Sequence, residues 1–302
     1  MEESKKPEGG PGWINPHIQG KIAWRDDDVV ISVPPKSGTT WTMNIVHQLR
    51  EKGDRSFDDI YAEVKWIETM ESPESTVEDM VKYIDKMPAS RPRAFKTHAS
   101  PPTLPFQQSI KYVVVVRNPE EAIVSMKTFT SKHSQEFLKY WGMPPEAFQW
   151  PDIEAFYNAF VKGVGMDKML FGFMAEWWKL RNEPNVLLLH YKDMVSDHEG
   201  SITKISDFLG YGPYTDDEWS AILELTSFQW MKKHEARFEA SSVWHIPVLE
   251  KGAMLRQGSF GMARTKDGMT EALGSDLEER GRKILTDEAA FDWMYNGGPI
   301  PE

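Results

Sequence analysis

Cysteine is absent from this 302-residue sequence. Disulfide bonds, thiolate ligands for zinc and thiol catalysis are therefore excluded, and the absence fits a reducing, cytoplasmic location. Long apolar runs are missing too, because the most apolar stretch, Val113–Val116, is far shorter than a membrane helix. The first twelve residues are polar and contain no apolar signal-peptide core. We therefore expect no association with a membrane.

Positive charge is scarce relative to negative charge. The chain carries 35 Lys and Arg against 46 Asp and Glu, which gives a formal net charge of −11. A long polyanion would be repelled by this average field, so we do not expect nucleic acid as a partner. A small anion remains possible, because local cations and backbone amides can override the average field.

The alternation of short apolar runs with helical patterns indicates an α/β fold. Expected strands are followed by segments whose apolar residues recur at helical spacing, which is typical of a parallel sheet covered by helices on both faces. We expect a loose tail over residues 1–20 and one domain over residues 21–302. Within that domain, residues 127–180 are too long for one crossover, and we interpret them as a helical elaboration over the sheet. The expected strands are Val29–Val33, Arg93–Thr97, Lys111–Arg117 and Asn185–His190.

A phosphate-binding loop is indicated between the first expected strand and the next helix. Pro34–Trp41 reads PPKSGTTW. Free backbone N–H groups at a helix start carry the positive end of the helix dipole, Gly38 lets an anion approach the backbone, and Lys36 adds a full charge. The alternative is an ordinary strand-to-helix turn, which the complete octet in this context disfavours.

A nucleotide kinase is the nearest competing function. The loop lacks the first glycine of G-x-x-x-x-G-K-[ST], and its lysine precedes the glycine. Such enzymes also place an acidic Mg²⁺ ligand at the end of a strand. Here the two most apolar strands end in Arg117 and His190. The sequence therefore disfavours metal-dependent phosphoryl transfer, and we expect no metal.

The octet resembles the 5′-phosphosulfate loop of cytosolic sulfotransferases that use 3′-phosphoadenosine 5′-phosphosulfate (PAPS). Further segments resemble that family's motifs in the same order along the chain, and they are Lys96-Thr97-His98, Val113–Ser125, Tyr191–Met194, Thr226–Phe228 and Arg256–Gly258. The resemblance extends from about Trp24 to Leu285, so the chain is identified as a member of this family. It implies PAPS as co-substrate, 3′-phosphoadenosine 5′-phosphate (PAP) as product, and a P-loop-like fold.

The resemblance also implies a set of ligands for the nucleotide. Two separated cationic sites suit a nucleotide with 3′ and 5′ phosphates better than a linear triphosphate. On its own, Arg117 would more often be a structural ion-pair residue and Ser125 a surface serine. For Trp41 the less favoured alternative is a core tryptophan on an amphipathic helix. The implied contacts are Lys36, Ser37, Gly38, Thr39 and Thr40 with the phosphosulfate, Arg117, Ser125, Arg256, Gln257 and Gly258 with the 3′-phosphate, and Trp41, Tyr191, Thr226 and Phe228 with adenine.

Three residues are expected to be catalytic. His98 ends a strand, where α/β active sites collect, and an imidazole suits removal of the acceptor proton. Only the Lys96-Thr97-His98 context distinguishes it among eight histidines. Lys36 and Lys96 would neutralise charge on the sulfo oxygens and on the departing phosphate during in-line displacement.

Two departures from the family pattern matter. Gln257 stands where the family has a lysine for the 3′-phosphate, and we expect Arg264 to compensate for a second lysine that the family has shortly after this motif. The family's C-terminal dimer motif is not recognisable over residues 264–273. The sequence therefore leaves monomer and homodimer open.

The acceptor is expected to be a small molecule bound beneath residues 127–180. Aromatic residues there suit phenols, sterols and other flat alcohols, and they also suit cationic, nitrogenous acceptors. Alternatives are dehydration through a sulfated intermediate and a non-catalytic PAP-binding module. The proposed wall of the acceptor site consists of Phe137, Tyr140, Trp141, Phe148 and Trp150. The acidic residues that leave a cationic acceptor possible are Glu136, Glu146 and Asp152.

Overall fold

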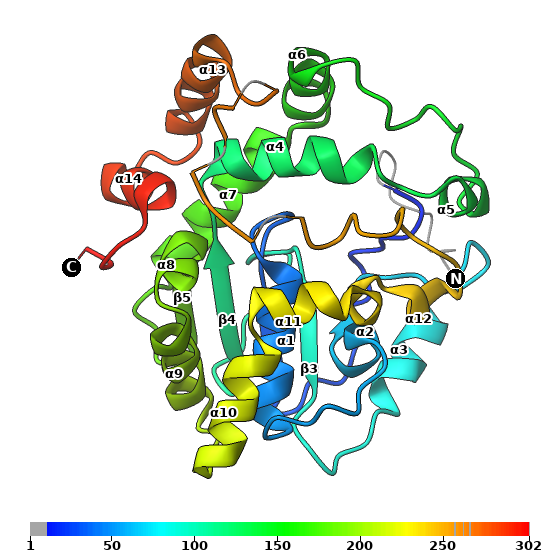
Figure 1. The fold of residues 1–302 in the computed structure, drawn as a ribbon, viewed down its shortest axis with the longest axis vertical. Coiled ribbons are helices and arrows are strands. Elements are labelled where there is room, and N and C mark those ends of the chain that lie inside the picture. Colours follow the sequence, from blue (N-terminus) through cyan, green and yellow to red (C-terminus); the bar gives the residue numbers. More distant parts are fainter. Residues whose placement is uncertain (1–10, 257, 262, 266, 302) are drawn as a thin grey trace.

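A parallel sheet of five strands lies at the centre of the molecule (Figure 1). The computed structural model describes residues 11–256, 258–261, 263–265 and 267–301. The strand order is β2-β3-β1-β4-β5, and all four pairings are parallel. Only the short β2 was not predicted. The strands are β1 (Val29–Ser32), β2 (Lys65–Trp66), β3 (Ala94–Thr97), β4 (Lys111–Val116) and β5 (Val186–His190).

Both faces of the sheet are covered, as the α/β interpretation predicts. Successive side chains of a strand point to opposite faces, so Val113 and Val115 pack in one apolar core and Val114 and Val116 in the other. Helices α1 (Thr39–Arg50), α9 (His198–Leu209) and α10 (Asp216–Leu225) cover the first face. Helices α7 (Met166–Lys179) and α14 (Glu288–Asn296) cover the second.

Side chains cap two of the helix starts. Asn118 caps α4 (Pro119–Thr130) by accepting from the backbone N–H of Glu120 and Glu121. Thr215 and Glu218 form a capping box at the start of α10. The remaining helices are α2 (Ile60–Glu63), α3 (Val77–Asp85), α5 (Gln135–Tyr140), α6 (Ile153–Phe156), α8 (Tyr191–Ser196), α11 (Phe228–Lys233), α12 (Ser241–Trp244) and α13 (Glu271–Arg282), with a π-helix at Tyr157–Val164 and a 3₁₀ helix at Glu235–Phe238.

Residues 11–20 are not a loose tail. The backbone N–H of Asn15 donates to the carbonyl oxygen of Glu68 over 2.7 Å, and Ile14 forms an antiparallel bridge with Thr69. Trp13 and Ile18 are buried, because the Trp13 ring packs against Phe137 and Ile18 packs in an apolar cluster with Ile67 and Met70. The prediction of a loose segment is therefore wrong for residues 11–20, and residues 1–10 lie outside the described part.

The 127–180 range contains two different structures. Its first part holds the end of α4, helices α5 and α6 and the π-helix. Its last part is α7, which packs directly on the sheet, since Trp177 Nε1 donates to Ser32 Oγ of β1 over 2.9 Å. Only the segment before Met166 is therefore additional to the sheet-covering layer.

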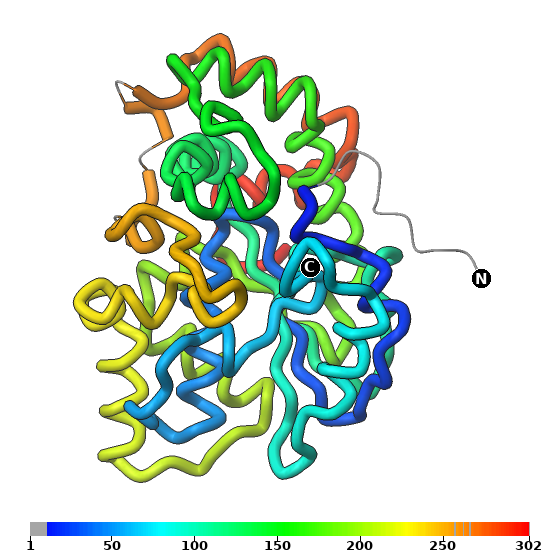
Figure 2. The backbone as a smooth tube through the Cα atoms, turned by 90° about the vertical axis from the view of Figure 1, so that its right-hand side faces the viewer, coloured from blue at the N-terminus to red at the C-terminus, as the bar shows by residue number. Residues whose placement is uncertain are grey.

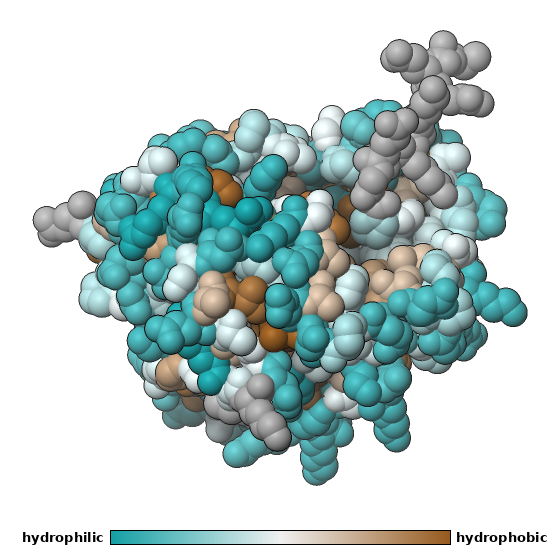
Figure 3. Space-filling model, turned by 90° about the horizontal axis from the view of Figure 1, so that it is seen from above, coloured by the Kyte–Doolittle hydropathy of each residue, from teal (hydrophilic) through white to brown (hydrophobic). Residues whose placement is uncertain are grey.

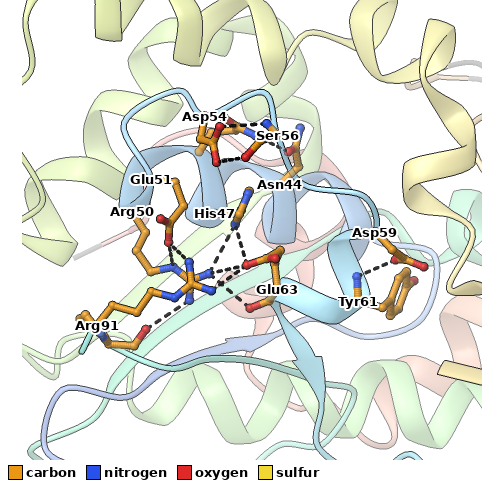
Figure 4. Close-up of polar contacts among 12 residues, drawn as sticks. Asn44, His47, Arg50, Glu51, Asp54, Ser56, Asp59, Tyr61, Glu63 and Arg91 are labelled. Atoms are coloured by element: carbon orange, nitrogen blue, oxygen red, sulfur yellow. Dashed lines mark hydrogen bonds and ion pairs between the residues drawn. The ribbon is translucent and has the colours of Figure 1, made fainter. Parts of the chain in front are cut away.

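Ionic contacts hold the carboxyl end of α1, opposite the phosphate loop. Arg50 Nε donates to Glu51 over 2.9 Å, and Arg91 Nη2 donates to Glu63 over 2.7 Å (Figure 4). The Arg50 side chain is only 4% exposed, so this contact is shielded from solvent. The network fixes the helix whose other end forms part of the phosphate loop.

The outer surface agrees with the charged composition. Seen from above, the molecule is mostly hydrophilic, with only small apolar patches (Figure 3). No helix among the described residues combines the length and apolar character needed to cross a bilayer.

Candidate nucleotide-binding and active site

The phosphate loop joins β1 to α1 with an open helix start. Gly38 is the N-cap residue, with φ of 98° and no side-chain cap hydrogen bond. A Cβ there would lie 2.8 Å from Cδ2 of Tyr191, so glycine is required by both backbone and space. Ser37 Oγ and Thr39 Oγ1 are buried without a hydrogen-bond partner among the described residues. Hydroxyl groups without a hydrogen-bond partner, next to the free backbone N–H groups of a helix start, are well placed to bind an anion.

A cavity of about 470 Å³ opens beside this loop. The chain that joins α12 to α13 runs between α4 and α11 at this point (Figure 1), and Figure 2 shows the same crossing from the side. The cavity is lined by Lys36, Gly38, Thr39, Thr40, Trp41, Arg117, Ser125, Thr128, Phe129, Tyr191, Val195, His198, Ser227, Phe228, Gln229, Met231, Ala253, Met254, Leu255, Arg256, Gly258 and Ser259. Four separate motifs of the sequence therefore meet with the loop in one cavity.

One end of the cavity is cationic. Arg117 Nε donates to Glu121 over 2.8 Å, and its two terminal nitrogens donate to the carbonyl oxygens of Lys36 and Ser259, each over 3.2 Å. Arg256 Nη1 donates to Thr128 Oγ1 over 2.8 Å. These contacts hold two guanidinium groups beside the phosphate loop.

Lys36 is the cation most affected by this arrangement. Burial and the charges of Arg117 and Arg256 lower the pKa of Lys36 to about 7. Its Nζ lies 3.8 Å from the ring centroid of Phe129. A bound anion would favour the charged form and raise this pKa.

We therefore predict that PAP binding near pH 8 takes up about one proton. Calorimetry in buffers of different ionisation enthalpy measures this uptake as the slope of apparent binding enthalpy. Lys36→Arg keeps the charge without a titration in this range, so the slope should fall towards zero. An equal slope in the wild type and Lys36→Arg would assign the proton to another group.

The other end of the cavity is aromatic. Trp41 Nε1 donates to the carbonyl oxygen of Thr226 over 2.8 Å, and its ring meets Tyr191 edge-on. Phe228 remains 36% exposed, on the cavity wall. A Cβ on Gly258 would lie 2.3 Å from the Phe228 ring, so this glycine permits the close approach. Such rings can stack on a base, each contact contributing about 1–3 kcal/mol.

Lys96 and His98 lie at the carboxyl end of β3. His98 Nδ1 lies 2.6 Å from the carbonyl oxygen of Val33, so Nδ1 carries the proton and donates it. Nε2 is then the basic nitrogen, and it lies 2.9 Å from Lys96 Nζ. Burial first, and the Lys96 charge second, hold the pKa of His98 well below its usual value. The imidazole is therefore neutral and basic at Nε2.

Residues that the sequence analysis did not single out surround Lys96. Its Nζ lies 3.3 Å from the ring centroid of Trp66. Glu68 is 4% exposed and accepts a hydrogen bond from Thr97. Burial lowers the pKa of Lys96, and the charge of Glu68 opposes that shift. Trp66 and Glu68 belong to β2 and its continuation, where no periodic pattern marks them.

Most of the expected nucleotide contacts lie together. Ser37, Lys96, His98 and Thr226 do not line the cavity. Ser37 and Thr226 are buried within its wall, and Lys96 and His98 lie close enough for the Lys36 charge to lower both pKa values. Gln257 lies outside the described residues. The residues brought together as expected are Lys36, Gly38, Thr39, Thr40, Trp41, Arg117, Ser125, Tyr191, Phe228, Arg256 and Gly258.

The compensating role expected of Arg264 is wrong. Its guanidinium makes two hydrogen bonds to the buried carboxylate of Glu120, over 2.9 and 2.7 Å. It does not line the cavity. A Cβ on Gly274 would lie 2.7 Å from Arg264, so the space for this ion pair depends on glycine.

The aromatic residues of the expected acceptor wall differ in their surroundings. Phe137 is buried against Trp13 and Trp244, whereas Tyr140 is 37% exposed at the surface. Phe148 packs on His133, with ring centroids 5.1 Å apart.

A cationic acceptor was considered because of three acidic residues, and all three face solvent. Glu136, Glu146 and Asp152 are exposed. Asp152 caps α6 by accepting from the backbone N–H of Ala155 over 2.8 Å. They therefore give no support to a cationic acceptor.

Comparison with known proteins identifies the family. A model of the sulfotransferase domain matches residues 26–287. The chain is 28% identical to human sulfotransferase 2A1 over 284 residues, covering 91% of each. It is 31% identical to human sulfotransferase 1E1 over 261 residues, covering 84% of this chain and 82% of that protein.

Solved structures show the same fold. Mouse sulfotransferase SULT7A1 complexed with PAP gives a TM-score of 0.69 at 23% identity, covering 92% of this chain and 91% of that chain. Retinol dehydratase in complex with androsterone and the inactive cofactor PAP gives 0.69 at 21% identity, covering 88% and 82%. The chain belongs to the cytosolic sulfotransferase family and is a PAPS-dependent sulfotransferase.

Proposed function

We propose that this enzyme transfers a sulfo group from PAPS to a hydroxyl or amine of a small-molecule acceptor by in-line displacement. The observation that carries the proposal is the His98 tautomer. Because Nδ1 donates to Val33, Nε2 is left as a base beside two lysines. A base held at a strand end next to a phosphate loop suits removal of a proton from an attacking group.

The proposed step is a single displacement at the sulfur atom of PAPS. A lone pair of the acceptor oxygen or nitrogen attacks sulfur while the bond between sulfur and the bridging oxygen breaks. The electron pair goes to the 5′-phosphate of PAP, and the acceptor proton goes to His98 Nε2. Lys96 must release Nε2 and turn to the sulfo oxygens, where it and Lys36 offset the developing charge.

Residue roles follow from position in the cavity. Lys36, Thr39 and Thr40, with Ser37 behind them, would hold the phosphosulfate. Arg117, Ser125 and Arg256 would hold the 3′-phosphate near Gly258. The acceptor would enter from the side of Phe129, which Lys36 already contacts, beneath the segment that precedes α7. The exposed acids favour a neutral alcohol or phenol over a cation.

We predict that Arg117→Ala removes the preference for PAP over 5′-AMP. The wild type should bind PAP about 100-fold more tightly, because charge-assisted contacts to the second phosphate are lost with 5′-AMP. Calorimetry with both nucleotides measures the ratio. Arg237→Ala removes a guanidinium that bonds to the Arg55 carbonyl oxygen and should leave the ratio unchanged. Survival of the preference in Arg117→Ala would place the second phosphate elsewhere.

Further parts of the sequence-based interpretation stay proposals. They are turnover without a metal, a cytoplasmic location and a monomeric or homodimeric state. Dehydration through a sulfated intermediate uses the same donor site, and product analysis separates it from simple sulfation. A non-catalytic PAP-binding role would predict binding without turnover.

A further inference from the structure

His198 lines the aromatic end of the cavity, although no motif marked it. It is the first residue of α9. Its ring lies 26° from the plane of the Trp41 ring, with centroids 5.9 Å apart. The imidazole therefore stands beside the ring that is expected to stack on the base.

The hydrogen bonds of Thr226 fix the tautomer of His198. Thr226 Oγ1 donates its proton to the carbonyl oxygen of Ile222 over 2.7 Å. The 3.0 Å contact between His198 Nε2 and the same Oγ1 must then have Nε2–H as the donor. Nδ1 is left with a free lone pair, and it has no hydrogen-bond partner among the described residues.

The surroundings keep this imidazole neutral. Burial lowers the pKa of His198, and the charges of Glu199 and Asp197 only partly oppose the shift. Both carboxylates are engaged elsewhere, since Asp197 accepts from Gly200 N–H over 3.0 Å and Glu199 accepts from Trp219 Nε1 over 3.0 Å. At neutral pH, Nδ1 is therefore a hydrogen-bond acceptor.

Several side chains at this end discriminate poorly between purines. Trp41 and Phe228 offer flat faces, which stack on any base. Thr226 has committed its proton and is fully buried. Ser227 Oγ donates to the carbonyl oxygen of Glu224 over 2.7 Å and accepts from Trp230 N–H over 3.2 Å. Gln229 is exposed.

We propose that His198 selects the base of the donor nucleotide, with Nδ1 accepting a hydrogen bond from the amino group of a 6-aminopurine. The inference rests on the proposed nucleotide site. A 6-oxopurine would bring a second acceptor against the Nδ1 lone pair, and two facing acceptors leave both unsatisfied. His198 would thus supply an acceptor for the base at a point where the Thr226 hydroxyl is already engaged by Ile222 and by His198 itself.

The test compares PAP with inosine 3′,5′-bisphosphate, which has the same phosphates and a 6-oxo group. Calorimetry gives the ratio of the two affinities for each variant. The wild type should favour PAP, and His198→Ala should lower the ratio about tenfold. His198→Gln can present a carbonyl oxygen and should keep part of the preference. A general loss of stacking would weaken both ligands equally and leave the ratio unchanged.

His17→Ala removes an exposed histidine outside the cavity; it is the control and should keep the wild-type ratio. The proposal is overturned if His198→Ala keeps the full preference, or if His17→Ala lowers the ratio equally. Nitrogen-15 NMR gives an independent readout, because Nδ1 should be unprotonated in the free protein and shift when PAP binds. A protonated Nδ1 in the free protein at neutral pH would also overturn it. Failure of PAP to bind the wild type would refute the nucleotide site itself.

Discussion

His98→Ala is expected to lower turnover by about 10³–10⁴-fold while PAP affinity stays unchanged. The proposed base is lost, but the cavity proposed to hold the nucleotide is not lined by this side chain. Stopped assays with a saturating un-ionised acceptor measure the first quantity, and calorimetry measures the second. His17→Ala removes an exposed histidine and should leave both unchanged. Near-normal turnover of His98→Ala with such an acceptor would remove His98 from the mechanism.

The pH dependence of the wild type gives a second view of the same residue. Burial lowers the pKa of His98 below 6.5, so the neutral, basic form persists as pH falls through that value. The acid limb of kcat/KM assigned to His98 should therefore lie below pH 6.5. An acid limb well above it would mean that the imidazole is charged in the free enzyme.

Lys36→Ala is expected to lower kcat at saturating PAPS by about 10²–10³-fold. The lysine is the cation of the phosphate loop, and its loss leaves charge on the departing phosphate without a partner. Lys36→Arg should recover part of the rate, since the guanidinium group restores the positive charge but has a different geometry from the ammonium group. Lys204→Ala removes an exposed lysine of α9 and should have no effect.

Raised donor KM with unchanged kcat in Lys36→Ala would contradict this role. That result would mean that Lys36 holds donor and transition state equally, and so contributes only to binding. The comparison with His98→Ala is informative, because Lys36 lines the proposed nucleotide cavity and His98 does not. PAP affinity should fall in Lys36→Ala and stay constant in His98→Ala.

The sheet, and the grouping of the proposed nucleotide ligands around one cavity, were largely predictable from the sequence. Buried parallel strands appear as continuous apolar runs, and four of the five strands were found within one residue of their ends. Carboxyl ends of parallel strands meet at one edge, so Arg117, after β4, lies close to Lys36, after β1. Local signals and a single topological rule therefore sufficed for these parts.

Other features depend on tertiary packing that no local pattern encodes. Trp13 is buried against Phe137, and Ile18 is buried against Ile67 and Met70, so both depend on distant parts of the chain. β2 has only two residues, too few to show a period. His198 is the first residue of α9, and the apolar pattern of that helix identifies only the face that is buried. The proposed role of His198 depends instead on a contact with Thr226, 28 positions away.

Charge compensation was the least predictable property. The position of Arg264 in the sequence suggested that it binds a phosphate. In the structure it forms two hydrogen bonds with the buried carboxylate of Glu120. A buried carboxylate without a partner is costly, so this ion pair takes precedence over a more distant phosphate. The pairing joins residues 144 positions apart, which no spacing rule anticipates.

Incubation with PAPS and a panel of phenols, alcohols and amines, with a chelator present, tests the central claim most directly. Mass spectrometry follows the acceptor and the nucleotide together. We predict that at least one neutral hydroxyl acceptor gains a sulfo group in step with PAP release, and that His98→Ala forms no such product. PAPS cleavage without any sulfated acceptor, or sulfation that continues undiminished in His98→Ala, would contradict the account.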